Sequence, residues 1–130
     1  MAQAPAVVPS PPRRWCEADL LAGRVTEGMS FTERCWALCK QVPPGRVCTY
    51  GDLARAAGSP RAAIAAGQAM ATNPYAPEIP CHRVVGADGA LHGYAYGLPR
   101  KQALLEQEGV AIRQGRVDLQ GPLRFTFSKS

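Results

Sequence analysis

Residues 49–71, TYGDLARAAGSPRAAIAAGQAMA, contain two helical patterns that meet at Gly58. Thr49 suits the N-cap of the first helix, and glycine suits the left-handed position that follows a helix end. Ser59 and Pro60 then suit the N-cap and the first turn of a second helix that runs to the end of the stretch. Two helices joined by a short turn that contains glycine predict a helix-turn-helix.

The second predicted helix carries almost no side-chain bulk. Its small residues are Ala62, Ala63, Ala65, Ala66, Gly67 and Ala69. Small residues allow close approach, either to other helices inside the protein or to a narrow partner such as the minor groove of DNA. Composition alone favours neither interpretation, and both remain open.

The flanking sequence adds further helices. Ser30 and Glu33 have the spacing of a capping box before a helical pattern that ends at a Pro-Pro-Gly sequence. Leu98 and Pro99 open a last helix that ends before Gly109. The expected fold class is therefore mainly α with a small β component.

Short strands are predicted after the helix-turn-helix. Residues 86–89, GADG, are typical of a turn, and the segments RVV at 83–85 and AL at 90–91 on either side predict a hairpin. A hairpin in this place forms a wing, so we expect a winged helix-turn-helix. Val117 and Leu119, which alternate with polar residues, predict one more short edge strand.

The length of 130 residues allows one domain with one hydrophobic core. The Pro-rich residues 1–14 predict a disordered leader, and residues 15–29 predict an N-terminal extension of ambiguous structure. We expect the folded domain at residues 30–119 and a C-terminal tail at residues 120–130. No run of about 18 apolar residues and no secretory signal is present, which excludes a membrane-spanning helix and predicts a cytoplasmic protein.

The net charge of +5 falls entirely on residues 30–130, because residues 1–29 hold three arginines and three acidic residues. A small basic domain suggests a polyanionic partner such as nucleic acid. The five cysteines show neither a C-x-x-C pair nor zinc-finger spacing. We therefore expect a reducing compartment, no disulfide framework and no metal site.

Cys81 and His82 lie in a constrained segment, NPYAPEIPCHRVV, at residues 73–85. A neighbouring imidazole and nearby cations favour the thiolate, which is the nucleophilic form of cysteine. Adjacent residues need not point their side chains at each other, so proton exchange can be direct or pass through water. A buried structural cysteine is the alternative for an arbitrary Cys-His pair.

The segment PCHRV at residues 80–84 resembles the active-site motif of the methylated-DNA–protein-cysteine methyltransferases, also called O6-alkylguanine-DNA alkyltransferases. The similarity covers roughly residues 30–119 without evident gaps. The other matching segments are VCTYGDLA at 47–54, GSPRAA at 58–63, GY at 93–94 and LLEQEG at 104–109. The resemblance implies a winged helix-turn-helix domain that moves an alkyl group from O6 of guanine in DNA to its own cysteine, once per molecule.

The resemblance assigns roles to residues of this sequence. Cys81 resembles the alkyl acceptor, His82 the base that reaches the sulfur through water, and Glu108 the carboxylate that orients the imidazole. Asn73 resembles the residue that braces the active-site turn, and Tyr50 the phenol that donates towards the departing guanine. No cofactor is implied, because the protein itself is the acceptor. The family's N-terminal domain, which binds zinc in some members, has no counterpart here, so no metal is implied.

Further residues are expected around the substrate, because an O6-alkyl group inside the base stack is reached only after the nucleotide is flipped out. The base pocket is expected to contain Val84, Tyr94, Ala95 and Tyr96. The surface that enters the minor groove is expected to contain Arg55, Arg61, Ala62, Ile64, Ala65 and Gly67.

Three positions depart from the family pattern. Ile64 stands where the family usually has an arginine that fills the vacated stack, and isoleucine cannot donate hydrogen bonds. Ala95 stands where many members have serine, and Tyr96 where several have glycine. A tyrosine ring narrows the pocket, so we expect small alkyl groups to be accepted and benzyl to be disfavoured.

Two other functions remain open. The alkyltransferase-like proteins bind alkylated DNA without transfer and flag it for other repair machinery, such as nucleotide-excision-repair proteins. They usually have tryptophan where this chain has Cys81, whereas Ile64 and Ala95 are compatible with such a sensor. A winged-helix transcription factor is the third interpretation, and it leaves the Cys-His pair without a role. In every case DNA is the partner, and we expect a monomer that binds no membrane.

Overall fold

The computed structural model describes residues 16–76, 78–92, 94 and 96–127, so the leader predicted over residues 1–14 lies outside them. The helices are α1 (Glu17–Leu21), α2 (Phe31–Lys40), α3 (Tyr50–Ala56), α4 (Ala63–Ala71) and α5 (Leu98–Gln107), with a single 3-10 turn, η1, at Cys81–Arg83. The strands are β1 (Cys48–Thr49), β2 (Val84–Val85), β3 (Ile112–Arg113) and β4 (Arg116–Val117). The expected fold class, mainly α with a small β component, is confirmed.

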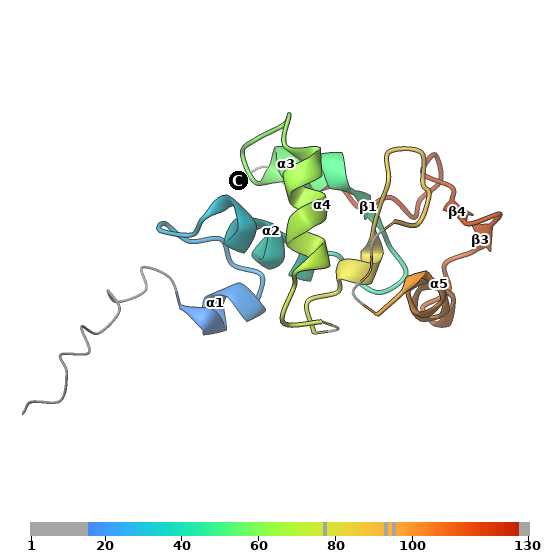
Figure 1. Ribbon diagram of the computed structural model, residues 1–130, viewed down its shortest axis with the longest axis horizontal. Coiled ribbons are helices and arrows are strands. Elements are labelled where there is room, and N and C mark those ends of the chain that lie inside the picture. The colour runs from blue at the N-terminus through green and yellow to red at the C-terminus, as the bar shows by residue number, and fades with distance from the viewer. Residues whose placement is uncertain (1–15, 77, 93, 95, 128–130) are drawn as a thin grey trace, which may run out of the picture.

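The helix-turn-helix occupies the middle of the molecule. Figure 1 shows α1 and α2 at one end, α3 and α4 in the centre, and α5 with β3 and β4 at the other end. Helices α2, α3 and α4 pack on one another around the larger core. A smaller core contains Val47, Val85, Leu105, Val110 and Val117. Among the described residues, no helix combines the length and apolar character needed to cross a membrane.

The starts of α2 and α3 follow from their capping residues, as predicted. Ser30 Oγ accepts from Glu33 N at 3.2 Å, and Glu33 Oε1 accepts from Ser30 N at 2.8 Å. Thr49 and Asp52 form the same reciprocal pair, with distances of 2.9 and 3.2 Å. Each pair satisfies two N–H groups that helix geometry leaves without a partner.

The end of α3 also follows the sequence. Gly58 has a φ of +95°, which disfavours any residue with a side chain. Ser59 N donates to Ala54 O at 2.9 Å, the bond typical of a Schellman helix end. The turn that follows α3 is therefore determined by local residues.

The start of α4 differs from the prediction. Ser59 and Pro60 do not open the helix, because Ala62 N donates to Ser59 O at 2.9 Å and closes a turn. The helix begins at Ala63. Proline's fixed φ suits the second position of a turn as well as the first position of a helix, so local sequence did not distinguish the two.

The strand pairing predicted over residues 83–91 is wrong. The turn is present, since Gly86 N donates to Ala90 O at 2.9 Å, but Ala90 forms its bridge with Arg116. Strand β2 pairs instead with β1, in parallel. Both valines of β2 are fully buried, and a parallel pair inside the core covers both faces of such a strand.

The short strand predicted at Val117 and Leu119 is confirmed only at Val117, in β4, which pairs antiparallel with β3, whereas Leu119 lies in the turn that follows. Gln114 and Gly115 join the two strands with φ values of +54° and +74°, as a tight two-residue hairpin turn requires. Gly89 lies so close to β4 that an added Cβ would fall 2.1 Å from Val117 O. This approach positions the 86–89 turn against the hairpin.

Segments outside residues 30–119 also pack on the domain. Leu20 of α1 is fully buried, and α1 contacts α2. At the other end, Val47 N donates to Leu123 O at 2.8 Å and Phe125 N donates to Val47 O at 2.7 Å. The described part of the C-terminal segment therefore runs along the core.

Helix α4 has one buried face and one exposed face. Ala66, Ala69 and Met70 are buried, where α4 packs on α2 and α3. Ile64 lies on the opposite side and is exposed. Close packing thus explains one face of the helix and leaves the other available to a partner.

Candidate active site

Cys81 begins the η1 turn, at the end of a loop that Asn73 holds together. The Asn73 side chain donates from Nδ2 to Ile79 O at 2.9 Å and accepts from Tyr75 N at 2.9 Å. Cys81 N donates to the same Ile79 oxygen at 2.8 Å. The predicted brace and the predicted nucleophile therefore share one carbonyl group.

The thiol of Cys81 is buried, with only 1% of the residue exposed. Burial raises the pKa of the thiol, and the hydrogen bond from Asn73 and the charge of Lys101 lower it by less. The expectation that nearby groups hold Cys81 as a thiolate is therefore wrong for this resting structure, because lost solvation outweighs them. A base must remove the proton before the sulfur can act as a nucleophile.

His82, the next residue in the sequence, is the candidate for that base. Its Nε2 lies 2.9 Å from Glu108 Oε2, and since a carboxylate only accepts, Nε2 carries the proton and Nδ1 keeps a lone pair. Nδ1 is buried and has no hydrogen-bond partner among the described residues. Burial lowers the pKa of His82 despite the hydrogen bond to Glu108, so the ring is neutral at neutral pH.

Glu108 follows the last residue of α5 and binds two partners. Besides His82, it accepts from Arg83 Nε at 2.8 Å and from Arg83 Nη2 at 2.7 Å. Burial opposes the ionisation of Glu108, but hydrogen bonds from Arg83 and His82 hold its pKa below the ordinary value. Sequence reasoning did not assign Arg83, although it lies directly after the Cys-His pair.

Tyr50 meets a buried lysine that sequence reasoning also missed. Tyr50 Oη donates to His92 O at 3.0 Å and accepts from Lys101 Nζ at 3.3 Å. Lys101 Nζ also donates to Val84 O at 2.7 Å and to His92 O. Burial raises the pKa of Tyr50, which keeps the phenol protonated, and lowers the pKa of Lys101 to about 8.

A signal for the burial of Lys101 is present in α5. Lys101 precedes Leu105 by four residues, so both lie on one face of the helix. Leu105 is fully buried, and so is Lys101. Lysines are rarely buried without partners, so the sequence favoured a solvated Lys101 and its burial was not predicted.

Tyr94 lies beside the imidazole, and Tyr96 lies beside Tyr94. The Tyr94 ring is edge-on to His82, with 6.3 Å between centroids, and Tyr96 is edge-on to Tyr94 at 5.5 Å. Together with Arg100 and Leu104, the two tyrosines line a pocket of about 270 Å³. Two of the four residues predicted for the base pocket therefore meet in one cavity.

The other two residues predicted for the base pocket are placed differently. Val84 is fully buried in the core, and its carbonyl accepts from Lys101. Ala95 lies outside the described residues.

Five of the six residues predicted to contact DNA lie at the start of α4 and along it, whereas Arg55 lies on α3. Ile64 is 82% exposed, and Arg61 is exposed in the turn before the helix. Ala62 and Ala65 are partly buried beside them. An added Cβ on Gly67 would lie 3.8 Å from the Tyr50 ring, so the helix passes over the phenol.

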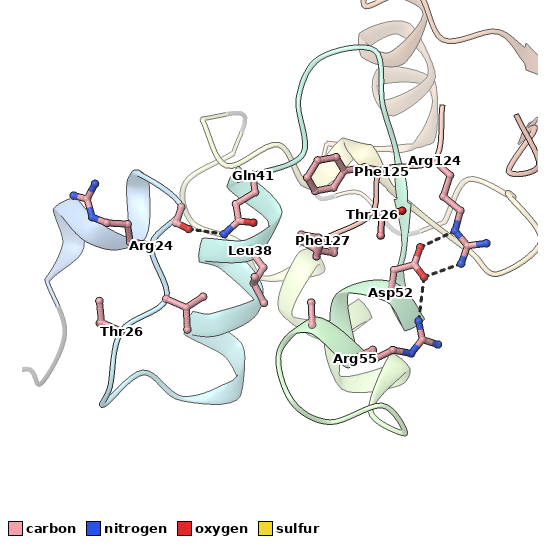
Figure 2. Close-up of a pocket in the computed structure, with 13 residues that line it drawn as sticks. Arg24, Thr26, Leu38, Gln41, Asp52, Arg55, Arg124, Phe125, Thr126 and Phe127 are labelled. Atoms are coloured by element: carbon pink, nitrogen blue, oxygen red, sulfur yellow. Dashed lines mark hydrogen bonds and ion pairs between the residues drawn. The ribbon is translucent and has the colours of Figure 1, made fainter. Parts of the chain in front are cut away.

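A groove of about 1130 Å³ lies elsewhere on the molecule. Figure 2 shows it between α2, α3, the 23–26 loop and residues 124–127. Asp52 at its edge accepts from Arg124 at 2.7 and 3.0 Å and forms an ion pair with Arg55 at 3.4 Å. Of the described residues assigned to catalysis, none lines this groove, so size alone does not mark the active site.

The part of the chain that the structure describes has no group of three or more His, Cys, Asp or Glu side chains arranged to hold a metal ion. All five cysteines are free, and Cys16 is the exposed one.

Comparison with known protein families places most of the chain in one of them. The family described as 6-O-methylguanine DNA methyltransferase, DNA binding domain, matches residues 30–110. A methylated-DNA–protein-cysteine methyltransferase from Methanosarcina acetivorans is 47% identical over 83 residues, which are 64% of this chain and 53% of that protein. The chain thus spans about half the length of the curated relative.

Two solved structures are similar as well. The structure of Mycobacterium tuberculosis OGT in complex with DNA has a TM-score of 0.60 and 42% identity, covering 71% of this chain and 62% of that one. The structure of S. pombe Atl1 in complex with damaged DNA containing O6-carboxymethylguanine has a TM-score of 0.67 and 30% identity. It covers 74% of this chain and 94% of that one.

Proposed function

Because this chain belongs to the 6-O-methylguanine DNA methyltransferase family, we propose that it transfers a small alkyl group, such as methyl, from O6 of guanine in DNA to Cys81. One observation carries the proposal. The buried thiol is followed directly by an imidazole whose Nδ1 has no partner among the described residues, and whose Nε2 is held by Glu108. This arrangement supports removal of a proton from Cys81 and has no evident structural purpose otherwise.

In the reaction, Cys81 Sγ forms a bond to the alkyl carbon while the bond from that carbon to O6 breaks. The thiol proton passes to His82 Nδ1, directly or through water. The base then takes up one proton and leaves as ordinary guanine. The product is a thioether, which water does not cleave, so each molecule reacts once and no cofactor takes part.

Tyr50 assists the departure of the base, and Asn73 helps to position the sulfur. The Tyr50 phenol is protonated, and by turning from His92 O it can donate to the departing base, which is a poor leaving group as an anion. Asn73 holds the loop that positions the sulfur. The role of Asn73 is supported by its hydrogen bonds in the loop that leads to Cys81.

The alkylated nucleotide reaches the site by rotating out of the duplex. The exposed Ile64 at the start of α4 suits a wedge inserted from the minor groove, and Arg55 and Arg61 suit contacts to phosphates. The pocket beside Tyr94 and Tyr96 then receives the base. We propose residues 30–119 as the unit that performs these steps, in a reducing, cytoplasmic compartment.

Intact-protein mass spectrometry tests transfer. After incubation with an oligonucleotide that contains O6-methylguanine, we expect a mass gain of one methyl group per protein molecule. Cys81→Ala should show no gain, whereas Cys16→Ser, which changes the exposed cysteine, should retain it. A protein that binds the oligonucleotide and keeps its original mass would contradict the proposal.

A lesion sensor is the second candidate function. The similarity to S. pombe Atl1, which extends over 94% of that chain, favours it. So does the burial of Cys81, because only 1% of the residue is open to an approaching base in this resting structure. A sensor would bind O6-alkylguanine DNA tightly, remain unmodified in the mass measurement, and hand the lesion to nucleotide-excision-repair proteins.

A further inference from the structure

The Arg83 side chain donates hydrogen bonds from three of its nitrogen atoms, Nε, Nη1 and Nη2. It binds both carboxylate oxygens of Glu108, at 2.8 and 2.7 Å, and Nη1 donates to Val42 O at 2.8 Å. The side chain of Arg83 is 13% exposed, and that of Glu108 is 17% exposed. The ion pair between Arg83 and Glu108 is therefore shielded from solvent. One of the two carboxylate oxygens, Glu108 Oε2, is also the hydrogen-bond partner of His82.

We propose that Arg83 is a positioning residue that keeps His82 neutral and ready to accept a proton, by offsetting the negative charge of Glu108. The proposal rests on the proposed function in one respect, which is that the proton accepted by His82 comes from Cys81. A lone carboxylate beside a buried imidazole stabilises the imidazolium, which has no lone pair left for the thiol proton. A carboxylate already paired with guanidinium orients the ring without charging it.

The direction of the His82 shift agrees with this geometry. Burial lowers the pKa of His82, the hydrogen bond and charge of Glu108 raise it, and the charges of Arg83 and Lys101 lower it. Two cations therefore oppose one anion around the ring. The remaining groups that face His82, the Cys81 thiol and the Tyr94 phenol, are neutral, since burial raises the pKa of each.

Arg83 and Lys101 differ in how constant their charges are. Burial lowers the pKa of Lys101 to about 8, so its charge declines above neutral pH. A guanidinium stays charged throughout this range. Of the two cations near His82, Arg83 is therefore the one whose charge does not decline above neutral pH.

NMR titration of the histidine rings tests the proposal directly, with or without DNA. The chain has only two histidines, so His92→Gln assigns the two sets of ring signals. We expect Arg83→Gln to raise the pKa of His82 by about one unit, because the Glu108 charge is no longer offset. Glu108→Gln alone should instead lower the pKa of His82, because the hydrogen bond and the charge of Glu108 raise it.

Transfer kinetics provide a second readout that a purely structural role would not move. Arg83→Gln should slow transfer several-fold near about pH 6, where a raised pKa leaves His82 protonated, and should approach the wild-type rate near about pH 8. If Arg83→Gln does not fold, Arg83→Lys carries the test. Lysine leaves one carboxylate oxygen without its partner, so a smaller rise in the pKa of His82 is expected.

An unchanged or lowered pKa of His82 in folded Arg83→Gln, or in Arg83→Lys where the glutamine variant does not fold, would overturn the proposal. This outcome is distinct from failure of the proposed function. A shifted His82 in a protein that never gains a methyl group would preserve the role of Arg83 and exclude transfer.

Discussion

Lys101 Nζ lies 3.3 Å from Tyr50 Oη, beneath the helix that carries Ile64, and no part of Lys101 is exposed. The ammonium also binds two main-chain carbonyls, those of Val84 and His92. It therefore joins α3, β2, α5 and the segment after the 86–89 turn at one point. A buried cation in this position affects both the stability of the fold and the orientation of the phenol.

Lys101 should give the protein a stability that rises with pH in the alkaline range. The pKa of Lys101 in the folded protein is about 8, and that of an unfolded lysine is about 10.4. Between these values the unfolded state binds more protons, so raising the pH favours the folded state. Below about pH 8 both states are charged and the cost of burying the ammonium is fully present.

Urea unfolding of wild type and Lys101→Met measures this effect. From about pH 8 to about pH 10.5 the unfolding free energy of wild type should increase relative to the variant, by up to about 3 kcal/mol. The comparison with the variant cancels the cysteine and tyrosine titrations, which act in the opposite direction. A difference that stays flat with pH would show that Lys101 is solvated.

Removal of the Tyr50 hydroxyl should slow transfer more than it weakens binding. The hydroxyl is a donor for the leaving base, and general acids contribute at least about tenfold to such steps. Tyr50→Phe is therefore expected to lower the single-turnover rate by about tenfold or more, with little change in DNA affinity. Tyr75→Phe, whose hydroxyl binds Glu17 outside the site, is the matched control.

Substitution of Ile64 should act on DNA binding. Ile64 is the large apolar side chain most exposed in the described part of the chain, which fits insertion into a base stack. Ile64→Ala should weaken binding to duplex DNA with O6-methylguanine, measured by fluorescence anisotropy. Ile64→Arg should tighten it and steepen the salt dependence by about one phosphate contact. Gln68→Ala, an exposed change on the same helix, is the control, and equal effects at both positions would contradict the wedge.

Tyr96 should limit the size of the alkyl group. Its ring lines the pocket of about 270 Å³ and packs edge-on against Tyr94. We expect faster reaction with O6-methylguanine than with O6-benzylguanine in DNA, and Tyr96→Gly should raise the benzyl rate selectively. Equal rates for both adducts in the wild type would refute this interpretation.

The reliable sequence predictions concern residues that interact within a few positions. Ser30 with Glu33 and Thr49 with Asp52 cap their helices across three residues, and Gly58 ends α3 in the same way. These bonds form as soon as the local backbone adopts the helix, so nothing distant can change them. The Cys81-His82 motif was equally visible, because its members are adjacent.

The errors arose where two local structures had similar energies. Pro60 suits a turn and a helix start, and only packing of α4 on α3 selected the turn. Strand β2 could have paired with residues 90–91, and burial of both its valines selected β1. The selection between such alternatives depends on which surface the fold buries, and the local sequence does not determine this surface.

The sequence by itself determined the helical composition, the caps of α2 and α3 and the identity of the candidate reactive pair. Only the tertiary structure decided that Cys81 rests as a buried thiol, that Lys101 lies under Tyr50, and that Arg83 shares Glu108 with His82. The physical reason is separation along the chain. Arg83 and Glu108 are 25 positions apart and Tyr50 and Lys101 are 51 apart. Such pairs meet only after the core has formed, and their charges and proton affinities follow from the burial that the core imposes.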